Sequence, residues 1–388
     1  MGDAILGGLG ALFEGIRFLF AHGGPNVIMI AVACTMFWLA IARGVEPLLL
    51  MPIAFGCLLV NLPLSEVMDA GGVLNTLYAF GIGNELFPLL IFVGIGSMTD
   101  FTPLLANPRL LLFGAAGQVG IFVTLILALA LGFSKEEAVS VAAIGACDGP
   151  TVIYVSNMFA EMGRIPTAMV GALAVAAYSY MALVPVIQPP IMRLMTTKKE
   201  RAVKMPSPKG KISPAALIAF PIVVTVVTGI IAPKGLPLMG MIMLGNFLKV
   251  SGVVPRLVNA SENEIANVAT LFLGLAIGGT MAGQQFLTRE TLMVFALGLV
   301  AITIDTVGGI FLGKIWYLLS GGKVNPLVGA AGISAYPMAA RIVQSEGQRW
   351  NKQNFLLMHA MAANTGGQIG SVMAAAIMLS ILKGMGIL

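Results

Sequence analysis

Two short polar stretches interrupt an otherwise apolar chain, and they constrain its fold more than any other feature. They are Gly145–Thr151 (GACDGPT) and Gly332–Met338 (GISAYPM), which start 187 residues apart. In each, a glycine precedes a proline by five residues. A membrane helix broken at such a point exposes backbone groups that only a protein-lined cavity can satisfy. Two broken helices in matching halves of a chain predict a transport site where the breaks meet, near the middle of the bilayer.

The composition places the chain in a membrane. Of its 388 residues, 58% are hydrophobic and only 10% are charged, and the mean hydropathy is +0.94. A soluble domain carries about 25% charged residues. The three cysteines have no CxxC spacing and there are only two histidines, so we expect neither a disulfide framework nor a bound transition metal. No nucleotide-binding motif is present, so energy for active transport must come from an ion gradient or from another subunit.

The net charge of +5 arises from one stretch between the two halves. Residues 198–211 contain six lysines and arginines against one glutamate. Because short basic loops stay cytoplasmic, we expect 196–213 to be a cytoplasmic linker, and no nucleic-acid partner is needed to explain it. At the N-terminus, apolar side chains recur every three or four residues, which predicts an amphipathic helix over 1–23 that lies on the membrane surface.

We therefore expect an all-α polytopic membrane protein with two weakly similar repeats, 24–195 and 214–388. Residues 174–180 match 360–366 at an offset of 186, close to the offset of the two breaks. Inverted repeats are the common transporter arrangement. Half-helices are predicted at 136–147 with 151–160, and at 324–334 with 337–344. The other apolar segments are 26–42, 47–62, 86–99, 110–132, 167–192, 214–232, 236–250, 267–286, 291–319 and 354–382.

Asp148 is the main candidate in the first break. A carboxylate inside the bilayer costs several kcal/mol, roughly 2.5 to 3.5 on insertion scales, unless it faces a cavity or a partner. One interpretation is a cap for the half-helix that begins near Pro150. The other is a cation ligand that can alternatively take a proton, with Thr151 offering a hydroxyl oxygen next to it.

The second half supplies neutral oxygens and one cation. Asn325 and Ser334 could ligate an alkali cation, and Arg341 follows the second break. A guanidinium suits a carboxylate ligand in a bidentate geometry. The alternative for Arg341 is a position at the membrane edge, where its side chain would reach the lipid headgroups.

Four further polar residues interrupt apolar helices. Tyr178 and Tyr180 could serve in proton transfer or could simply pack in the core. Asn364 is the repeat counterpart of Tyr178 and lies in the polar run Asn-Thr-Gly-Gly-Gln. Asp305 is a second acid in an apolar stretch, and its partner is not evident from the sequence.

Three segments resemble one family. They are Asp148–Thr151, residues 176–192 (AAYSYMALVPVIQPPIM) and Asn325–Arg341 (NPLVGAAGISAYPMAAR). All are similar to the membrane β-subunit of the biotin-dependent sodium-pumping decarboxylases, which include the oxaloacetate, methylmalonyl-CoA and glutaconyl-CoA enzymes. The resemblance extends over nearly the whole chain, from about residue 24 to 388.

The resemblance implies an enzyme, a carboxybiotin decarboxylase that consumes a proton and exports Na⁺. It implies a biotin carrier protein, a carboxyltransferase α-subunit and a small γ/δ-type membrane subunit as partners, a homotrimeric core, and a bacterial or archaeal cytoplasmic membrane. Catalytic roles would fall on Asp148, Tyr180, Tyr178 and Arg341. Carboxybiotin would be held by Arg341 and Asn325. The Na⁺ ligands would come from Asp148, Thr151, Asn325, Gly329, Ser334 and Asn364.

A Na⁺-coupled secondary transporter of organic carboxylates is the alternative, since broken helices with an aspartate and an arginine would serve it equally well. The two classes differ in their need for partners. A carrier works alone, whereas a decarboxylase subunit requires a biotinylated protein. The acyl-CoA or keto acid used by such a complex would be selected by the carboxyltransferase, which is another chain.

Overall fold

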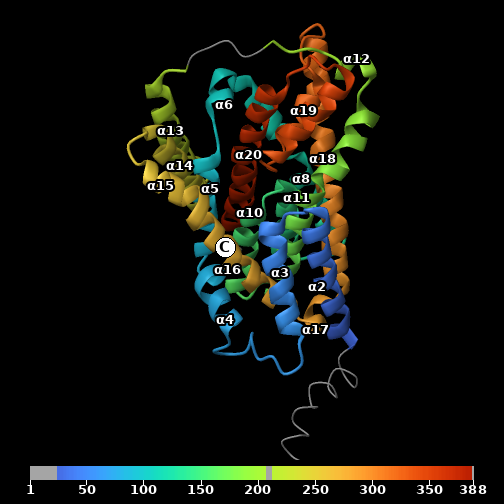
Figure 1. Cartoon of the computed structure of the whole chain (residues 1–388), viewed down its shortest axis with the longest axis vertical. Coiled ribbons are helices and arrows are strands. Elements are labelled where there is room, and N and C mark those ends of the chain that lie inside the picture. Colours follow the sequence, from blue (N-terminus) through green and yellow to red (C-terminus); the bar gives the residue numbers. More distant parts are fainter. Residues whose placement is uncertain (1–23, 207–211, 387–388) are drawn as a thin grey trace, which may run out of the picture.

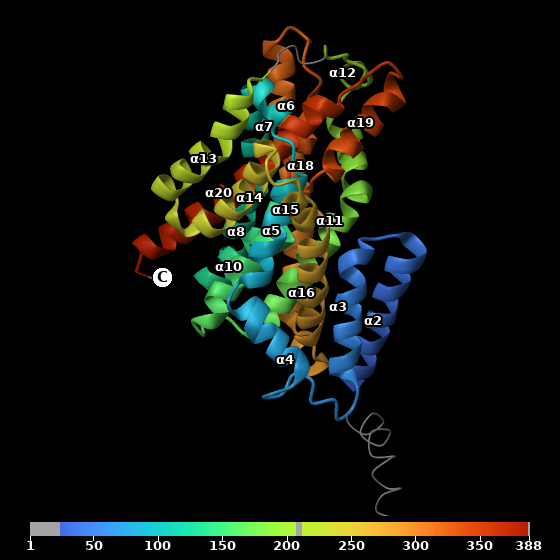
Figure 2. The same cartoon turned by 60° about the vertical axis from the view of Figure 1, so that its left-hand side comes forward.

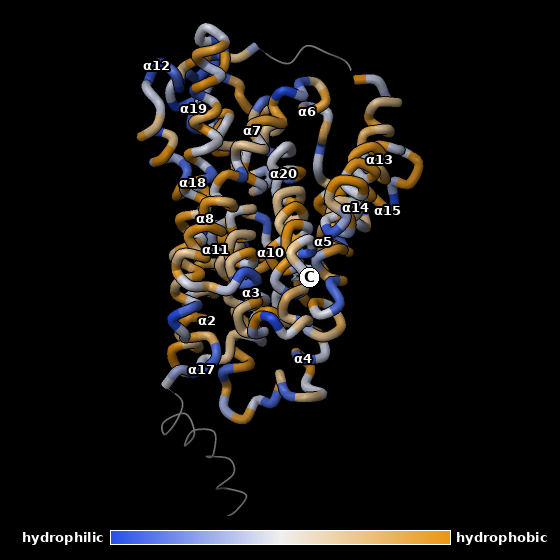
Figure 3. Tube along the Cα trace, turned by 180° about the vertical axis from the view of Figure 1, so that it is seen from behind, coloured by the Kyte–Doolittle hydropathy of each residue, from blue (hydrophilic) through white to orange (hydrophobic). Residues whose placement is uncertain are grey.

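The computed structural model describes residues 24–206 and 212–386, and every regular element among them is a helix. The amphipathic helix predicted for 1–23 lies outside the described residues, as do 207–211 of the basic linker. By length and composition, five of the described helices can cross a membrane, or seven if each of two bent pairs is one span. Figure 3 shows apolar residues along these helices. Hydrophilic residues gather at α12 (Lys198–Arg201), at α19 (Met338–Trp350) and in the loop before α4 (Val73–Leu77). The prediction of an all-α multi-pass membrane protein is confirmed.

The first half begins with a hairpin of two helices, which a bent pair, a broken span and a long helix follow. Apolar side chains cover these helices on nearly all sides, as expected where lipid or other helices surround them. The elements are α2 (Gly24–Arg43), α3 (Pro47–Asn61), α4 (Val73–Leu77), the π-helical η1 (Tyr78–Gly83), α5 (Leu86–Met98), α6 (Thr102–Ala106), η2 (Pro108–Leu110), α7 (Leu111–Ala116), α8 (Val119–Ala130), α9 (Lys135–Ala142), η3 (Ala143–Ala146), α10 (Gly149–Glu161) and α11 (Thr167–Met195).

The second half repeats much of this order, including a π-helical turn before a long apolar helix. Its elements are α13 (Pro214–Ile231), η4 (Pro233–Gly235), α14 (Leu236–Ser251), α15 (Pro255–Ala260), the π-helical η5 (Ser261–Ile265), α16 (Ala266–Gly279), α17 (Gly283–Phe286), α18 (Arg289–Leu319), η6 (Pro326–Gly332), α19 (Met338–Trp350) and α20 (Leu357–Gly384).

Helices of the two halves pack against each other. In the second half α16 packs along α3 and α14 along α5, while α20 packs on α7 and α18 on α11. Figure 1 shows that α2 runs upward from the bottom of the molecule, whereas α13, its counterpart in order, runs downward from the top. Figure 2 shows the α2–α3 hairpin and the α13–α14 hairpin on opposite sides of the central helices. Opposite directions of corresponding helices are what an inverted repeat requires.

The breaks differ in detail from their predictions. The first follows the predicted half-helices closely, with α9 and η3 on one side and α10 on the other. In the second, residues 326–332 form the 3₁₀ turns of η6 and not an α-helix. The backbone of η6 closely approaches that of α18 (Arg289–Leu319), since a Cβ on Gly329 would lie 1.9 Å from the carbonyl oxygen of Gly309.

A third break, which the sequence reading missed, divides the apolar stretch predicted as 110–132. The chain turns at Gly117–Gln118 between α7 and α8. A Cβ on Gly117 would lie 2.4 Å from the carbonyl oxygen of Gly332, so the turn sits directly against the second predicted break. The Gln118 Nε2 donates to the carbonyls of Gly114 (3.1 Å) and Gly332 (3.2 Å). A side-chain amide thus takes up backbone groups that the broken helices leave free.

Candidate functional site

The first break holds Asp148 where the chain reverses between two helices. Cys147 adopts a left-handed conformation (φ 50°), and α10 then begins at Gly149 with Pro150 in its first turn. Proline is favoured there because its missing N–H would have no helical partner anyway. Asp148 is only 8% exposed, and its Oδ2 accepts a hydrogen bond from the Thr151 hydroxyl (2.7 Å). Thr151 therefore orients the carboxylate that the sequence singled out.

The second break presents a run of backbone carbonyls and one hydroxyl. Ser334 donates its hydroxyl proton to the carbonyl of Gly367 in α20 (2.8 Å). The Asn364 Nδ2, one turn earlier in α20, donates to the carbonyl of Ile333 (2.6 Å). The Asn364 Oδ1 is buried and accepts no hydrogen bond within the described part of the chain. Asn364 is fully buried, whereas Ser334 is 4% exposed and its hydroxyl oxygen keeps lone pairs for a ligand at the break.

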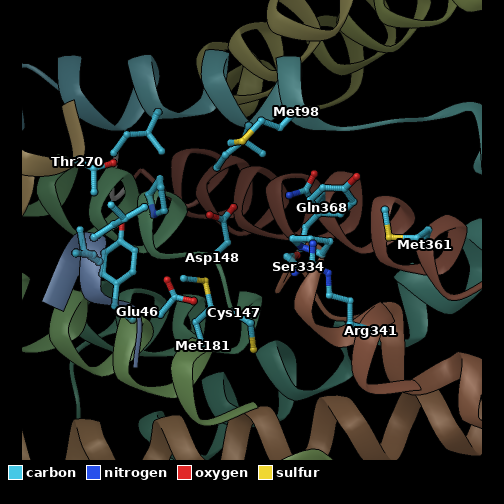
Figure 4. Close-up of a pocket in the computed structure, with 18 of the residues that line it drawn as sticks. Glu46, Met98, Cys147, Asp148, Met181, Thr270, Ser334, Arg341, Met361 and Gln368 are labelled. Carbon is cyan, nitrogen blue, oxygen red and sulfur yellow. The ribbon is translucent and has the colours of Figure 1, made fainter. Parts of the chain in front are cut away.

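A cavity of about 620 Å³ connects the two breaks. Ligand sites in proteins commonly span about 300–1,000 Å³. Figure 4 shows Asp148 and Cys147 of the first break, and Ser334 and Arg341 of the second, reaching into the same space. The further polar lining residues are Glu46, Tyr178, Thr270, Tyr336 and Gln368. The meeting of the two breaks predicted from the sequence is what creates this site.

The charges in the cavity are separated. Asp148 and Glu46 are its acidic side chains, and Arg341 on α19 is its basic one. Arg341 is exposed, and among the residues that the structure describes it forms no ion pair. Its guanidinium can therefore bind an added carboxylate without first releasing a protein partner.

Tyr178 and Tyr180 lie on the same helix, α11, but face different neighbours. Tyr178 lines the cavity, and a Cβ on Gly149 would lie 2.1 Å from its ring, so that glycine leaves room for the phenol. Tyr180 instead faces α18, where its hydroxyl donates to the carbonyl of Phe295 and its ring lies against Gly298. Of these two tyrosines, Tyr178 and not Tyr180 lines the cavity, which also contains the phenol of Tyr336.

Asn325 lies away from the cavity, and its side chain forms hydrogen bonds with backbone groups. Its Nδ2 donates to the carbonyls of Arg201 (3.0 Å) and Val203 (2.9 Å), and its Oδ1 accepts from the N–H of Leu327 (3.0 Å). The residue therefore ties the start of the linker to η6. Among the described residues, this leaves Asn325 without a free amide group to ligate a cation or carboxybiotin.

Gly329 also serves the packing. Alanine at this position is expected to destabilise the protein by about 1–3 kcal/mol, because its methyl group would overlap the backbone of α18. Gly240→Ala is the matched control, since a Cβ there would meet nothing within 4 Å. Thermal unfolding of the detergent-solubilised protein would measure the difference. Equal stability of the two variants would contradict the packing role.

Asp305 has a structural partner that the sequence did not reveal. It is fully buried, and its Oδ1 accepts from the N–H of Gly120, in the first turn of α8. The carboxyl group thus takes up a backbone donor that the α7–α8 break leaves without a helical acceptor. Its Oδ2 lies 3.1 Å from the place where a Cβ of Gly145 would be.

We expect Asp305→Leu to lower the free energy of unfolding by about 1–3 kcal/mol, because the buried N–H of Gly120 would lose its acceptor. Asp305→Asn keeps an acceptor oxygen and should lose much less. Thermal unfolding of both variants in detergent checks this. If the asparagine variant were as unstable as the leucine variant, the negative charge and not the hydrogen bond would be the contribution of Asp305.

Two residues gave little signal in the sequence: Glu46, which lines the cavity, and Gln118, which does not line it but hydrogen-bonds to the second break. Glu46 precedes a proline at the end of an apolar segment, which is the pattern of an ordinary turn. Gln118 is a lone amide in an apolar stretch, and that isolation was the one available hint of the α7–α8 break.

Comparison with known proteins identifies the family of the chain. The family model for the Na⁺-transporting oxaloacetate decarboxylase beta subunit matches residues 25–382. Methylmalonyl-CoA decarboxylase subunit beta of Veillonella parvula is 48% identical over 358 residues, covering 92% of this chain and 93% of the relative. Glutaconyl-CoA decarboxylase subunit beta of Acidaminococcus fermentans is 45% identical over 382 residues, with 98% and 100% covered.

Relatives of the third type are more distant. Oxaloacetate decarboxylase beta chain 2 of Salmonella typhi is 41% identical over 438 aligned positions, which cover 97% of this chain and 99% of the relative. The resemblance inferred from the three motifs is therefore confirmed over almost the whole chain. This protein belongs to the family of the beta subunits of Na⁺-transporting decarboxylases.

Proposed function

We propose that this chain decarboxylates carboxybiotin, presented by a biotin carrier protein, and couples the reaction to export of Na⁺. The observation that carries the proposal is one cavity with a buried aspartate from the first break and, just after the second break, an arginine that forms no ion pair among the described residues. The acidic side suits a cation and the basic side suits a carboxylate. Both substrates of the coupled reaction thus have a complementary group in the same space.

The Na⁺ ligands that the geometry favours are oxygens of both breaks. Asp148 supplies the negative charge and Ser334 a neutral oxygen, since both line the cavity, whereas Asn364 does not line it, although its Oδ1 has no partner among the described residues. Hard oxygen donors are the ligands that alkali and alkaline-earth cations prefer. Thr151 supports this set by orienting Asp148. Asn325 and Gly329 are better explained as residues that hold η6 in place.

Arg341 would hold the carboxylate of carboxybiotin. Loss of CO₂ from the ureido nitrogen breaks the N–C bond, and the nitrogen then takes one proton to regenerate biotin. The reaction therefore consumes a proton at the site. Tyr178, which lines the cavity beside Gly149, is the phenol placed to deliver it. Protonation of Asp148 would remove its charge and release Na⁺, which links the proton to the cation.

The wider assembly follows from the family. We propose a biotin carrier protein and a carboxyltransferase α-subunit as soluble partners, a small γ-type membrane subunit, and a homotrimeric core in a bacterial cytoplasmic membrane. We propose that the basic segment at α12 lies at the cytoplasmic end, where the carrier would dock, because short basic loops stay cytoplasmic. We also propose that the two halves are inverted repeats, which the opposite directions of α2 and α13 support.

The test uses the purified complex in liposomes, with carboxylated biotin carrier supplied on the outside and Na⁺ either present or absent. Release of CO₂ that requires Na⁺, together with movement of Na⁺ across the membrane, is the expected result. If CO₂ were released at no Na⁺ concentration and the chain alone took up an organic acid down a Na⁺ gradient, the protein would be a secondary transporter.

A further inference from the structure

The short turn between α2 and α3 carries an acidic side chain in an unusual conformation. Glu46 has φ 37° and ψ 57°, in the left-handed region. A residue other than glycine seldom adopts this conformation, and such residues are concentrated at functional sites. The turn therefore fixes the direction of the Glu46 side chain, although this backbone conformation is unfavourable for a residue other than glycine.

The carboxylate of Glu46 is not used by the fold. Glu46 stands at the N-cap position of α3, but its side chain makes no capping hydrogen bond. Within the described residues, the carboxylate of Glu46 takes part in no other hydrogen bond and in no ion pair. Arg43, the nearest basic residue in the chain, instead stacks on Trp38, with its guanidinium carbon 5.1 Å from the ring centre.

The carboxylate is directed into the cavity that also contains Asp148. Figure 4 shows both acidic groups, with Cys147 and Met181 beside Glu46 and with Arg341 on the other side of Asp148 in that view. The wall around Glu46 is mostly apolar, with Leu48 and Leu49 among the lining residues, and Tyr178 and Ser179 are its polar members. A half-buried carboxylate in an apolar wall, without a cation of the protein, is costly unless a cation from outside accompanies it.

We propose that Glu46 is a second anionic ligand for Na⁺, which holds the cation on the α2–α3 side of the cavity next to Asp148. Two carboxylates that line one cavity raise the local concentration of cations and favour transfer of an ion from one to the other. The α2–α3 turn thereby becomes part of the Na⁺ path, although neither of the two breaks includes it. This inference rests on the proposed function of the cavity as a Na⁺ site.

The test compares Glu46→Gln with Glu66→Gln in the intact complex, by measuring CO₂ release from carboxylated carrier at increasing Na⁺ concentrations. Glu66 is the matched control, because it is also a left-handed glutamate (φ 46°) in a loop, yet it is exposed and does not line the cavity. For Glu46→Gln we expect the half-activating Na⁺ concentration to rise about tenfold, since one charge near the cation is lost. The rate should recover when Na⁺ is raised, and Glu66→Gln should leave the Na⁺ dependence as it is.

Each other outcome overturns a different statement. An unchanged half-activating Na⁺ concentration in Glu46→Gln, while Asp148→Asn abolishes the Na⁺ response, would refute the role of Glu46 and leave the proposed cavity intact. A rate that falls equally at every Na⁺ concentration would also refute it, because the side chain would then act on the fold or on the carrier. If Asp148→Asn kept its Na⁺ response, the proposed function of the cavity would fail first.

Discussion

Asp148→Asn is expected to lower the Na⁺-dependent rate of decarboxylation at least about a hundredfold, which corresponds to about 2.7 kcal/mol of lost stabilisation. The reason is the loss of the buried carboxylate that lines the cavity where the two breaks meet. The substitution keeps the shape of the side chain and an oxygen that can still accept from the Thr151 hydroxyl. The fold should therefore survive. CO₂ release as a function of Na⁺ concentration is the measurement.

Two further variants separate the charge from its surroundings. Asp69→Asn removes an exposed acid from the loop before α4 and should leave the rate unchanged. Thr151→Val removes the hydroxyl that orients the carboxylate but leaves the charge, so its effect should be smaller than that of Asp148→Asn. Full Na⁺-dependent turnover in Asp148→Asn would show that the cation binds elsewhere.

Arg341→Gln is expected to raise the concentration of carboxylated carrier needed for half-maximal rate by at least about tenfold, since a charge-assisted bond to a carboxylate contributes about 1.5–3 kcal/mol. The half-activating Na⁺ concentration should change little, because Arg341 lies on the basic side of the cavity. Arg341→Lys should restore the charge without the bidentate geometry and give an intermediate result. Steady-state rates at several carrier and Na⁺ concentrations separate the two effects.

Arg349 provides the control for Arg341. It lies on the same helix, is exposed, and pairs with Glu346 at 3.5 Å, so it is not available to a ligand of the cavity. Arg349→Gln should leave the carrier dependence unchanged. An equal loss in both variants would mean that α19 acts through its overall positive charge, as a docking surface, and not through one guanidinium in the site.

The local pattern of the chain was sufficient for the helical class and for the positions of two breaks. Long apolar stretches admit only helices in a membrane, and glycine followed by proline marks the points where a helix must stop. Asp148, Ser334 and Arg341 could be found for the same reason, since each lies within or just after a break. The family could be recognised because its motifs are these same segments.

Which side chains share the cavity was decided by packing between distant segments. Tyr178 and Tyr180 are two residues apart in one helix and so point about 200° apart around its axis. Only the neighbouring helices determine which of them meets the cavity and which meets α18. Asn325 resembled a ligand in the sequence, yet backbone carbonyls at Arg201 and Val203 occupy its amide. Side chains of the same type can either bind a ligand or hold the backbone in place. Their role is therefore known only once their contacts in the folded protein are known.

The sequence by itself determined that this protein is a helical membrane protein with two polar breaks, because apolar length and helix-breaking residues act locally. The tertiary structure alone decided which side chains line the cavity between the breaks, that Gln118 joins a third break to the second, and that Glu46 lines the same cavity as Asp148. These contacts link residues far apart in the chain. They depend on how helices of one half pack against helices of the other, which no local pattern of residues specifies.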